Sequence, residues 1–302
     1  MKHLIACLAF VSALLAPRVG AADVKVVTTT PDLASVAAAV GGKHADVTAL
    51  ALPTQDPHFV DARPHLALAL SRADLLVVVG LDLEVGWLPT LQTNARNGDI
   101  QAGSRGYLDA SKHVDRLGVP KTRIDRSMGD VHPGGNPHYM FDPRAALAVA
   151  RAMAGRMAEI DSDHAEAYRR NLERFESRVR AKLRKWKRAA KALSGEPVVT
   201  YHFSFPYLAD WLGFEVVSQV EPKPGIPPNP RHVMRVLKRA RKRNVGIVLQ
   251  EGWYPTNASE LIADKAGATL VRIPGGPDFK GGESYVHWID GVVARLVRAA
   301  KE

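Results

Sequence analysis

One helical segment of the chain is much longer than an average helix, and strands and helices alternate on both sides of it. Apolar side chains recur at helical spacing from about residue 163 to Leu193, among them Tyr168, Phe175 and Trp186. Such a helix would be about 45 Å long. Because its other positions are heavily charged and a polar helix of this length often bridges two lobes, we expect two lobes joined by one long helix.

The segments before and after this helix each contain short apolar runs that indicate strands. The predicted strands are Val24–Thr29, Asp46–Leu50, Asp74–Gly80, Pro197–Tyr201, Glu215–Ser218, Val245–Gln250 and Thr269–Ile273. Helical patterns separate them, and the continuous apolar run at Asp74–Gly80 is typical of a strand that is covered on both faces. This alternation predicts an α/β fold in which each lobe has a parallel sheet flanked by helices.

The first residues have the features of a secretory signal peptide. Lys2 precedes an apolar run from Leu4 to Ala16, and the segment ends in the small residues Val19-Gly20-Ala21, with cleavage expected after Ala21 or Ala22. The run is too short to span a membrane, so we expect a soluble protein in the periplasm. The predicted division is a signal peptide at 1–22, an N-terminal lobe at 23–162, the connecting helix at 163–193 and a C-terminal lobe at 194–302.

The signal peptide also contains the one cysteine of the sequence, Cys7. The mature protein is therefore expected to have no disulfide bond and no thiolate metal ligand. Any transition-metal site must be built from histidine and carboxylate side chains.

The chain is basic, with a formal net charge of +10. Much of the excess lies in two runs, Arg178–Lys191 and Arg231–Arg243. A basic run can mark a nucleic-acid or anionic-membrane contact, although the solvated face of a helix is the commoner interpretation. Export argues against nucleic acid as a partner, which leaves a permease or the acidic membrane face for this surface to meet.

Three of the eleven histidines follow predicted strands or lie in loops at the strand ends. They are His58 and His138 in the first lobe and His202 in the second. Ligands of open α/β sheets bind at the carboxyl ends of strands, and neutral imidazole is a good zinc ligand. The three side chains would enclose an ion between the lobes. The loop that contains His138 also carries His132, which is either an auxiliary ligand or a supporting group.

Three segments, in this order, resemble the metal-ligand segments of the metal-binding solute receptors of ABC importers, the ZnuA/TroA-like group (cluster A-I). They are DPH at 56–58, GNPHYMFDP at 135–143 and YHFSFPYLADWLGF at 201–214. The proline-rich segment at 221–230 also resembles a segment common in that family. The resemblance implies two α/β lobes joined by a rigid helix, small lobe movements, and metal ligation by His58, His138 and His202.

The resemblance also bears on the fourth ligand and on the metal. Many members of the family supply an aspartate after the last strand, and Asp278 is the nearest candidate here; Glu251, Glu283 and a water molecule are alternatives. Manganese receptors of the family tend to have a carboxylate in place of the third histidine. This chain has His202 there, so zinc is favoured and manganese remains an alternative.

Two other functions compete with a receptor. A zinc hydrolase would need a general base beside a metal-bound water, and the sequence has no HExxH or paired-carboxylate motif. A basic protein that binds anionic surfaces through Arg178–Lys191 would leave the three histidines unexplained. The sequence therefore predicts a monomeric, non-enzymatic receptor that captures a divalent metal ion, zinc before manganese, and delivers it to the permease of an ABC importer.

Overall fold

The computed structural model describes residues 23–122, 129 and 131–302, so the predicted signal peptide lies outside the described residues. The strands are β1 (Val24–Thr28), β2 (Ala45–Ala49), β3 (Leu75–Val78), β4 (Tyr107–Asp109), β5 (Pro197–Thr200), β6 (Glu215–Gln219), β7 (Ile247–Glu251) and β8 (Thr269–Ile273). They form two four-stranded sheets with the orders β2-β1-β3-β4 and β6-β5-β7-β8. All the pairs between neighbouring strands are parallel.

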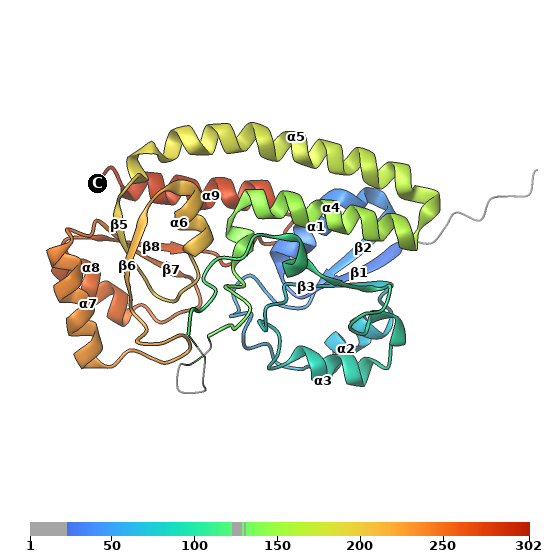
Figure 1. Cartoon of the computed structure of the whole chain (residues 1–302), viewed down its shortest axis with the longest axis horizontal. Helices are drawn as coiled ribbons and strands as arrows, with labels where there is room; N and C mark the ends of the chain where they lie inside the picture. Colours follow the sequence, from blue (N-terminus) through green and yellow to red (C-terminus); the bar gives the residue numbers. More distant parts are fainter. Residues whose placement is uncertain (1–22, 123–128, 130) are drawn as a thin grey trace, which may run out of the picture.

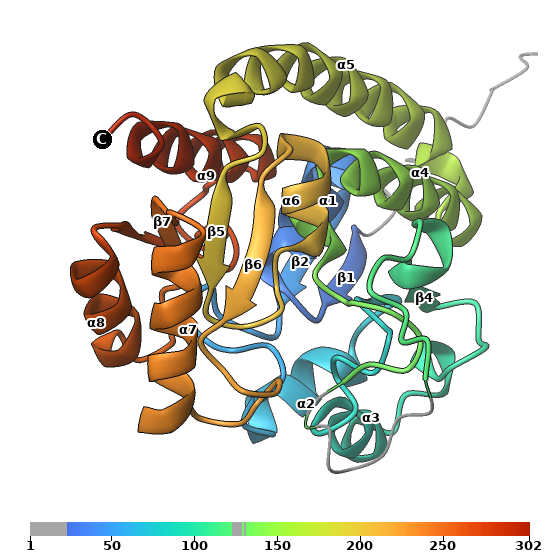
Figure 2. The same cartoon turned by 60° about the vertical axis from the view of Figure 1, so that its left-hand side comes forward.

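Helices cover both faces of each sheet. The helices are α1 (Pro31–Gly41), α2 (Pro64–Ser71), α3 (Leu88–Ala95), α4 (Pro143–Ile160), α5 (Ala165–Ala189), α6 (Pro206–Leu212), α7 (Pro230–Lys242), α8 (Asn257–Ala266) and α9 (Tyr285–Ala299). Helix α5 runs above both lobes, and α4 and α9 lie beneath it (Figure 1). The arrowheads of β5 and β6 point away from α5 (Figure 2), so the carboxyl ends of these strands lie on the opposite side.

The predicted fold class is confirmed: the chain has two parallel sheets and one long helix, α5, that lies within the predicted connecting segment. Among the described residues, no helix is both long enough and apolar enough to cross a membrane. Two elements were not predicted, α3 and the three-residue strand β4. The sequence around β4 is polar and rich in glycine, and three residues are too few to show a period.

The two lobes share one apolar core on the side of the long helix. This core extends without interruption from α1 and α4 through α5 to α6 and α9. The Phe141 and Phe205 rings, one from each side, lie 5.1 Å apart between centroids. The Trp211 indole N–H donates to the Phe141 carbonyl at 2.9 Å, and the Tyr285 hydroxyl donates to the Met140 carbonyl at 2.8 Å. Contacts of this kind fix the lobes relative to each other.

Candidate metal centre

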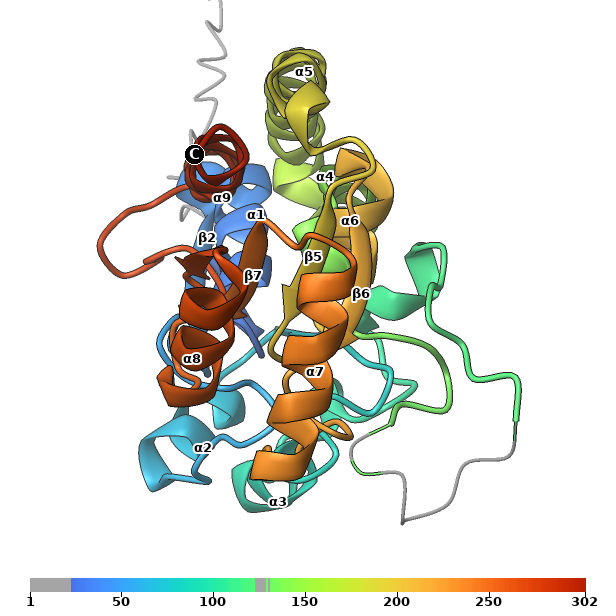
Figure 3. The same cartoon turned by 90° about the vertical axis from the view of Figure 1, so that its left-hand side faces the viewer.

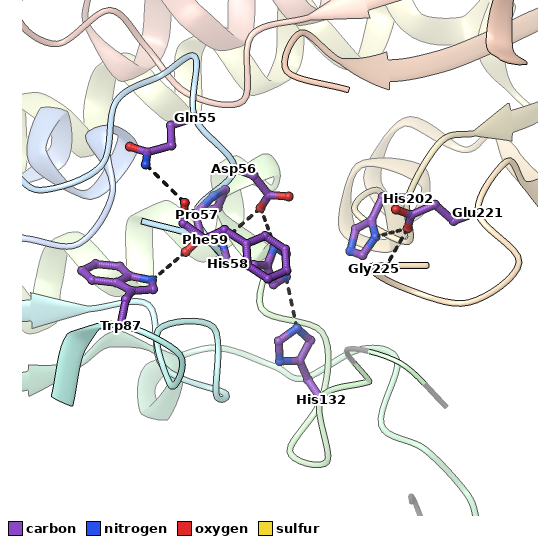
Figure 4. A network of polar contacts seen from close by, with 10 residues as sticks. All are labelled: Gln55, Asp56, Pro57, His58, Phe59, Trp87, His132, His202, Glu221 and Gly225. Carbon is purple, nitrogen blue, oxygen red and sulfur yellow. Dashed lines mark hydrogen bonds and ion pairs between the residues drawn. The ribbon is translucent and has the colours of Figure 1, made fainter. Parts of the chain in front are cut away.

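His58 lies in the loop after β2, and its ring is oriented by a carboxylate two residues earlier. Asp56 Oδ1 lies 2.7 Å from His58 Nδ1 and also accepts the His58 backbone N–H at 3.0 Å. On the other side of the loop, the Trp87 indole N–H donates to the Pro57 carbonyl at 2.9 Å (Figure 4). These contacts occupy Nδ1, so that Nε2, whose neighbour is His132 Nε2, is the nitrogen that can bind a metal ion.

His138 lies just before α4, in a loop held by contacts to both lobes. Asn136 Oδ1 accepts the His138 backbone N–H at 2.9 Å, and Asn136 Nδ2 donates to the Phe203 carbonyl at 2.6 Å across the interface. Helix α4 begins at Pro143, and Asp142 caps it by accepting the Arg144 backbone N–H at 2.7 Å. His138 is therefore fixed by a helix start on one side and by the second lobe on the other.

His202 follows β5 and is 4 % exposed. Its Nδ1 lies 2.7 Å from Glu221 Oε2, which also accepts the Gly225 backbone N–H at 3.2 Å. Glu221 and Gly225 belong to the proline-rich segment between β6 and α7 (Figure 4). This segment therefore orients the third histidine and, as at His58, leaves Nε2 available for a metal ion.

The structure brings His58, His138 and His202 together between the lobes, and we call them the histidine triad. Each offers one ligand atom, and these atoms all lie within 4.8 Å of one another. His138 Nε2 is buried and makes no hydrogen bond with the described residues. A buried, unpaired imidazole nitrogen is costly unless a metal ion or another partner satisfies it, so the triad fits a metal ion that binds imidazole.

His132 lies beside the triad but is not part of that group. Its Nε2 is 3.3 Å from His58 Nε2 (Figure 4), and the two ring centroids are 5.4 Å apart. It contacts the triad through His58, and its role as an auxiliary ligand or a supporting group stays a prediction.

The surroundings of His138 and His132 favour neutral imidazole, the form that binds metal. Burial, and then the neighbouring rings of His58 and His202, hold the pKa of His138 well below its ordinary value. Burial and the nearby His58 lower the pKa of His132 to about 4. Burial tends to raise the pKa of Asp56, but the hydrogen bonds and charge of His58 outweigh it and leave this pKa lowered. Asp56 is therefore an anion that can balance part of the charge of a bound cation.

Glu251, at the end of β7, is a buried carboxylic acid close to the triad. Its exposed fraction is 0 %, and neither side-chain oxygen makes a hydrogen bond of good geometry with the described residues. It lines the same small cavity between the lobes as His138 and Asp32. Burial raises the pKa of Glu251 to about 8 and outweighs the opposing effect of the nearby Ser204 hydroxyl. Glu251 is thus an unpaired acid that shares a cavity with His138 but lies outside the group that the three histidines form.

Asp278 and Glu283, the other carboxylate candidates, lie outside the triad. Asp278 is exposed, and its Oδ1 accepts the Gly281 backbone N–H at 3.0 Å. Glu283 Oε2 accepts the Asp278 backbone N–H at 2.8 Å. Both line a separate pocket with Arg272 and Arg295. The structure does not bring them into the group that the three histidines form.

The sequence analysis missed the two carboxylates that orient the histidines, Asp56 and Glu221. For Asp56 a signal was present, because it precedes His58 by two residues and a short acid at this spacing can bond the backbone and ring that follow. For Glu221 no local signal exists, since it lies nineteen residues from His202 in the sequence. Its role depends on the parallel pairing of β5 with β6.

The two-lobed fold with a histidine triad between the lobes defines a metal-binding solute receptor. The chain belongs to the ZnuA family, described as zinc-uptake complex component A, periplasmic, whose profile matches residues 26–299. It is therefore a non-enzymatic component of an ABC importer. The family prediction made from the sequence is confirmed.

The chain is similar to proteins that are described as binding different metals. The iron-binding protein YfeA of Yersinia pestis is 24% identical over 250 residues, which cover 81% of this chain and 74% of YfeA. The manganese-binding lipoprotein MntA of Bacillus subtilis is 28% identical and covers 64% and 60% of the two chains. A crystal structure of ZnuA superimposes with a TM-score of 0.76 at 21% identity and covers 92% and 99%. These likenesses support the fold but do not decide between zinc, manganese and iron.

Proposed function

We propose that this receptor binds zinc through His58, His138 and His202 and delivers it to the permease of its importer. The observation that carries the proposal is the closely spaced triad, in which Asp56 and Glu221 orient two of the rings. Three imidazoles without a thiolate suit zinc better than a harder ion such as manganese. We further expect a monomer in the periplasm, exported by the signal at 1–22.

The fourth position of the shell has two carboxylate candidates with different support. Asp278 is the candidate from the family resemblance, but it would have to leave its contact with Gly281 and move to the triad. Glu251 is supported by burial, by its unpaired oxygens and by the cavity that it shares with His138. A carboxylate in this position would also raise the affinity for manganese or iron. Among the relatives, YfeA is described as iron-binding and MntA as manganese-binding.

Calorimetric titration of the metal-free protein, residues 23–302, with zinc and with manganese tests the proposal. We expect one tight zinc site and weaker manganese binding. The variants Asp278→Ala and Glu251→Gln are titrated in parallel. The variant that weakens zinc binding identifies the carboxylate ligand. If neither does, the three histidines and a water complete the site. Absence of a tight site for both metals would contradict the receptor proposal, and tighter manganese than zinc binding would contradict the zinc assignment.

A further inference from the structure

Helix α7 carries a row of basic side chains along its exposed face. We call this row the α7 stripe; its members are Arg231, Arg235, Lys238 and Lys242, and all four are exposed. They follow one another at spacings of four, three and four residues, which places them on one side of a helix. At the usual helical rise the stripe is about 16 Å long.

The opposite face of α7 is packed, so the stripe cannot turn inward. Val233, Val236, Leu237 and Ala240 are buried there. Met234 is the large apolar side chain that the helix exposes, at 59%. The solvent face of α7 is therefore a fixed array of cations with little apolar surface.

The charge of the α7 stripe is not neutralised by its surroundings. Helix α7 contains no Asp or Glu, and in the described part of the chain none of the four stripe residues forms an ion pair. Arg235 instead contacts the His232 ring at 3.1 Å. Residues 177–245 as a whole contain sixteen Lys and Arg against four Asp and Glu. The positive charge of the protein is thus concentrated in this part of the chain.

The composition of this face distinguishes between two kinds of anionic partner. Protein interfaces are enriched in aromatic residues at their centres and depleted of lysine, whereas the α7 stripe has no aromatic side chain and two lysines. An anionic lipid surface needs no apolar recess and attracts clustered Lys and Arg side chains directly. The face fits lipid headgroups better than a protein.

We propose that the α7 stripe holds the receptor against the anionic phospholipid surface of the membrane that contains the importer. Helix α7 extends toward the side of the molecule that is opposite to α5 (Figures 1 and 3). The strands β5 and β6 point toward the same side (Figure 2). Contact with lipid there turns the strand ends that carry the histidine triad toward the membrane. This inference does not depend on which metal the triad binds.

Vesicle co-sedimentation of residues 23–302 tests the proposal. The vesicles are phosphatidylcholine with and without phosphatidylglycerol, at about 50 mM and about 300 mM salt. We expect binding only to the vesicles that contain phosphatidylglycerol, and at least about a tenfold loss of partition at the higher salt. Binding that is equal for the two vesicles, or absent from both, would overturn the proposal.

A matched pair of variants separates a local contact from net charge. In the α7 variant, all four stripe residues are replaced by Gln. In the control variant, four exposed cations in and just after the last turns of α5 are replaced by Gln: Arg184, Lys187, Arg188 and Lys191. We expect at least about a tenfold loss of lipid binding for the α7 variant and less than about threefold for the control. Equal losses would show that net charge alone acts and would overturn the proposal.

Two additional measurements keep the result interpretable. Thermal unfolding and zinc titration of both variants check that the fold and the metal site are intact; if the α7 variant is unstable, Lys238→Gln with Lys242→Gln replaces it. Zinc transport with the reconstituted permease in vesicles of neutral lipid tests for a protein partner. A loss of transport by the α7 variant there, together with no lipid binding by the wild type, would assign the stripe to the permease and overturn the lipid proposal.

Discussion

The interface between the lobes has two sides, which differ in how many of their buried polar atoms make hydrogen bonds. On the side of α5, aromatic rings interlock and their polar atoms find partners, as in the Trp211 contact with Phe141. On the side of the strand ends, His138 Nε2 and both oxygens of Glu251 are buried without a hydrogen bond to the described residues. The first side is complete without a ligand, whereas the second becomes complete when an ion binds.

The two sides of the interface therefore have different roles. The apolar side fixes the distance between the lobes, so that residues from both can be held near one point. The polar side keeps unpaired ligand atoms at that point, at a cost in stability that a metal ion offsets. The predictions below test the two sides separately, beginning with the largest expected effect.

Removing an aromatic ring from the apolar side should cause the largest loss of stability. Phe141 belongs to the first lobe, is 4% exposed and contacts the rings of Phe205 and Trp288 in the second lobe. We expect Phe141→Ala to lower the free energy of unfolding by about 3–5 kcal/mol, because it leaves a cavity. Denaturant unfolding of the metal-free protein measures this. Leu68→Ala is the control, since Leu68 is 51% exposed, and it should change stability by less than about 0.5 kcal/mol.

Removing a triad member should chiefly affect metal binding. Loss of a residue that only supports a metal ligand typically weakens metal binding by about 10–100-fold. His202→Ala should weaken zinc binding by more than this. His132→Ala should have a smaller effect, because the ring contact of His132 with the triad is to His58 and His132 lies outside the group of closely spaced ligand atoms. Zinc competition titration compares the two variants. Equal losses would place His132 among the ligands.

Removing a carboxylate that orients a ring should have an intermediate effect. Asp56→Asn and Glu221→Gln should each weaken zinc binding by about 10–100-fold, because each loses an anionic partner of a ligand ring. Asp61→Asn is a matched control, since Asp61 lies in the same loop region but is 72% exposed and pairs only with Arg63 among the described residues. The same competition titration applies. Affinities unchanged by the first two substitutions would exclude this role.

The unpaired acid on the polar side should make the metal-free protein less stable as pH rises. The pKa of Glu251 is raised in the folded state from 4.5 to about 8, so the unfolded chain loses its proton first. The stabilising contribution is full below about pH 4.5 and disappears through about pH 8, at up to about 1.4 kcal/mol per pH unit. Denaturant unfolding of the wild type and of Glu251→Gln between pH 7 and 8 measures this contribution, as the difference between their slopes of stability against pH.

Glu84 provides the control for this pH dependence. Burial raises its pKa to about 7, although Thr29 and the Val79 and Gly80 backbone N–H groups donate hydrogen bonds to it. Most of its contribution should therefore be lost by pH 7, and Glu84→Gln should reduce the slope between pH 7 and 8 by only about a third as much as Glu251→Gln does. A wild-type slope that Glu251→Gln does not reduce would contradict the account of the polar side.

The sequence predicts the sheets and the triad because both depend on local patterns. Apolar runs such as Asp74–Gly80 mark strands, and the position of a histidine after a strand places it at a known edge of the sheet. Strand β4 was not predicted because three residues are too few to show an alternating pattern. The role of Glu221 was not predicted because its partner, His202, is distant in sequence. The segment 274–284 holds several Gly and Pro residues and no periodicity, so the location of Asp278 could not be derived from its residues.

X-ray absorption at the zinc edge tests the central claim most directly, because imidazole ligands give a characteristic scattering pattern. For the zinc-loaded wild type we predict three imidazole ligands. The His132→Ala variant should retain three, and His202→Ala should retain two. Fewer than three in the wild type, or a loss of one in His132→Ala but none in His202→Ala, would contradict the claim that His58, His138 and His202 hold the ion between the lobes.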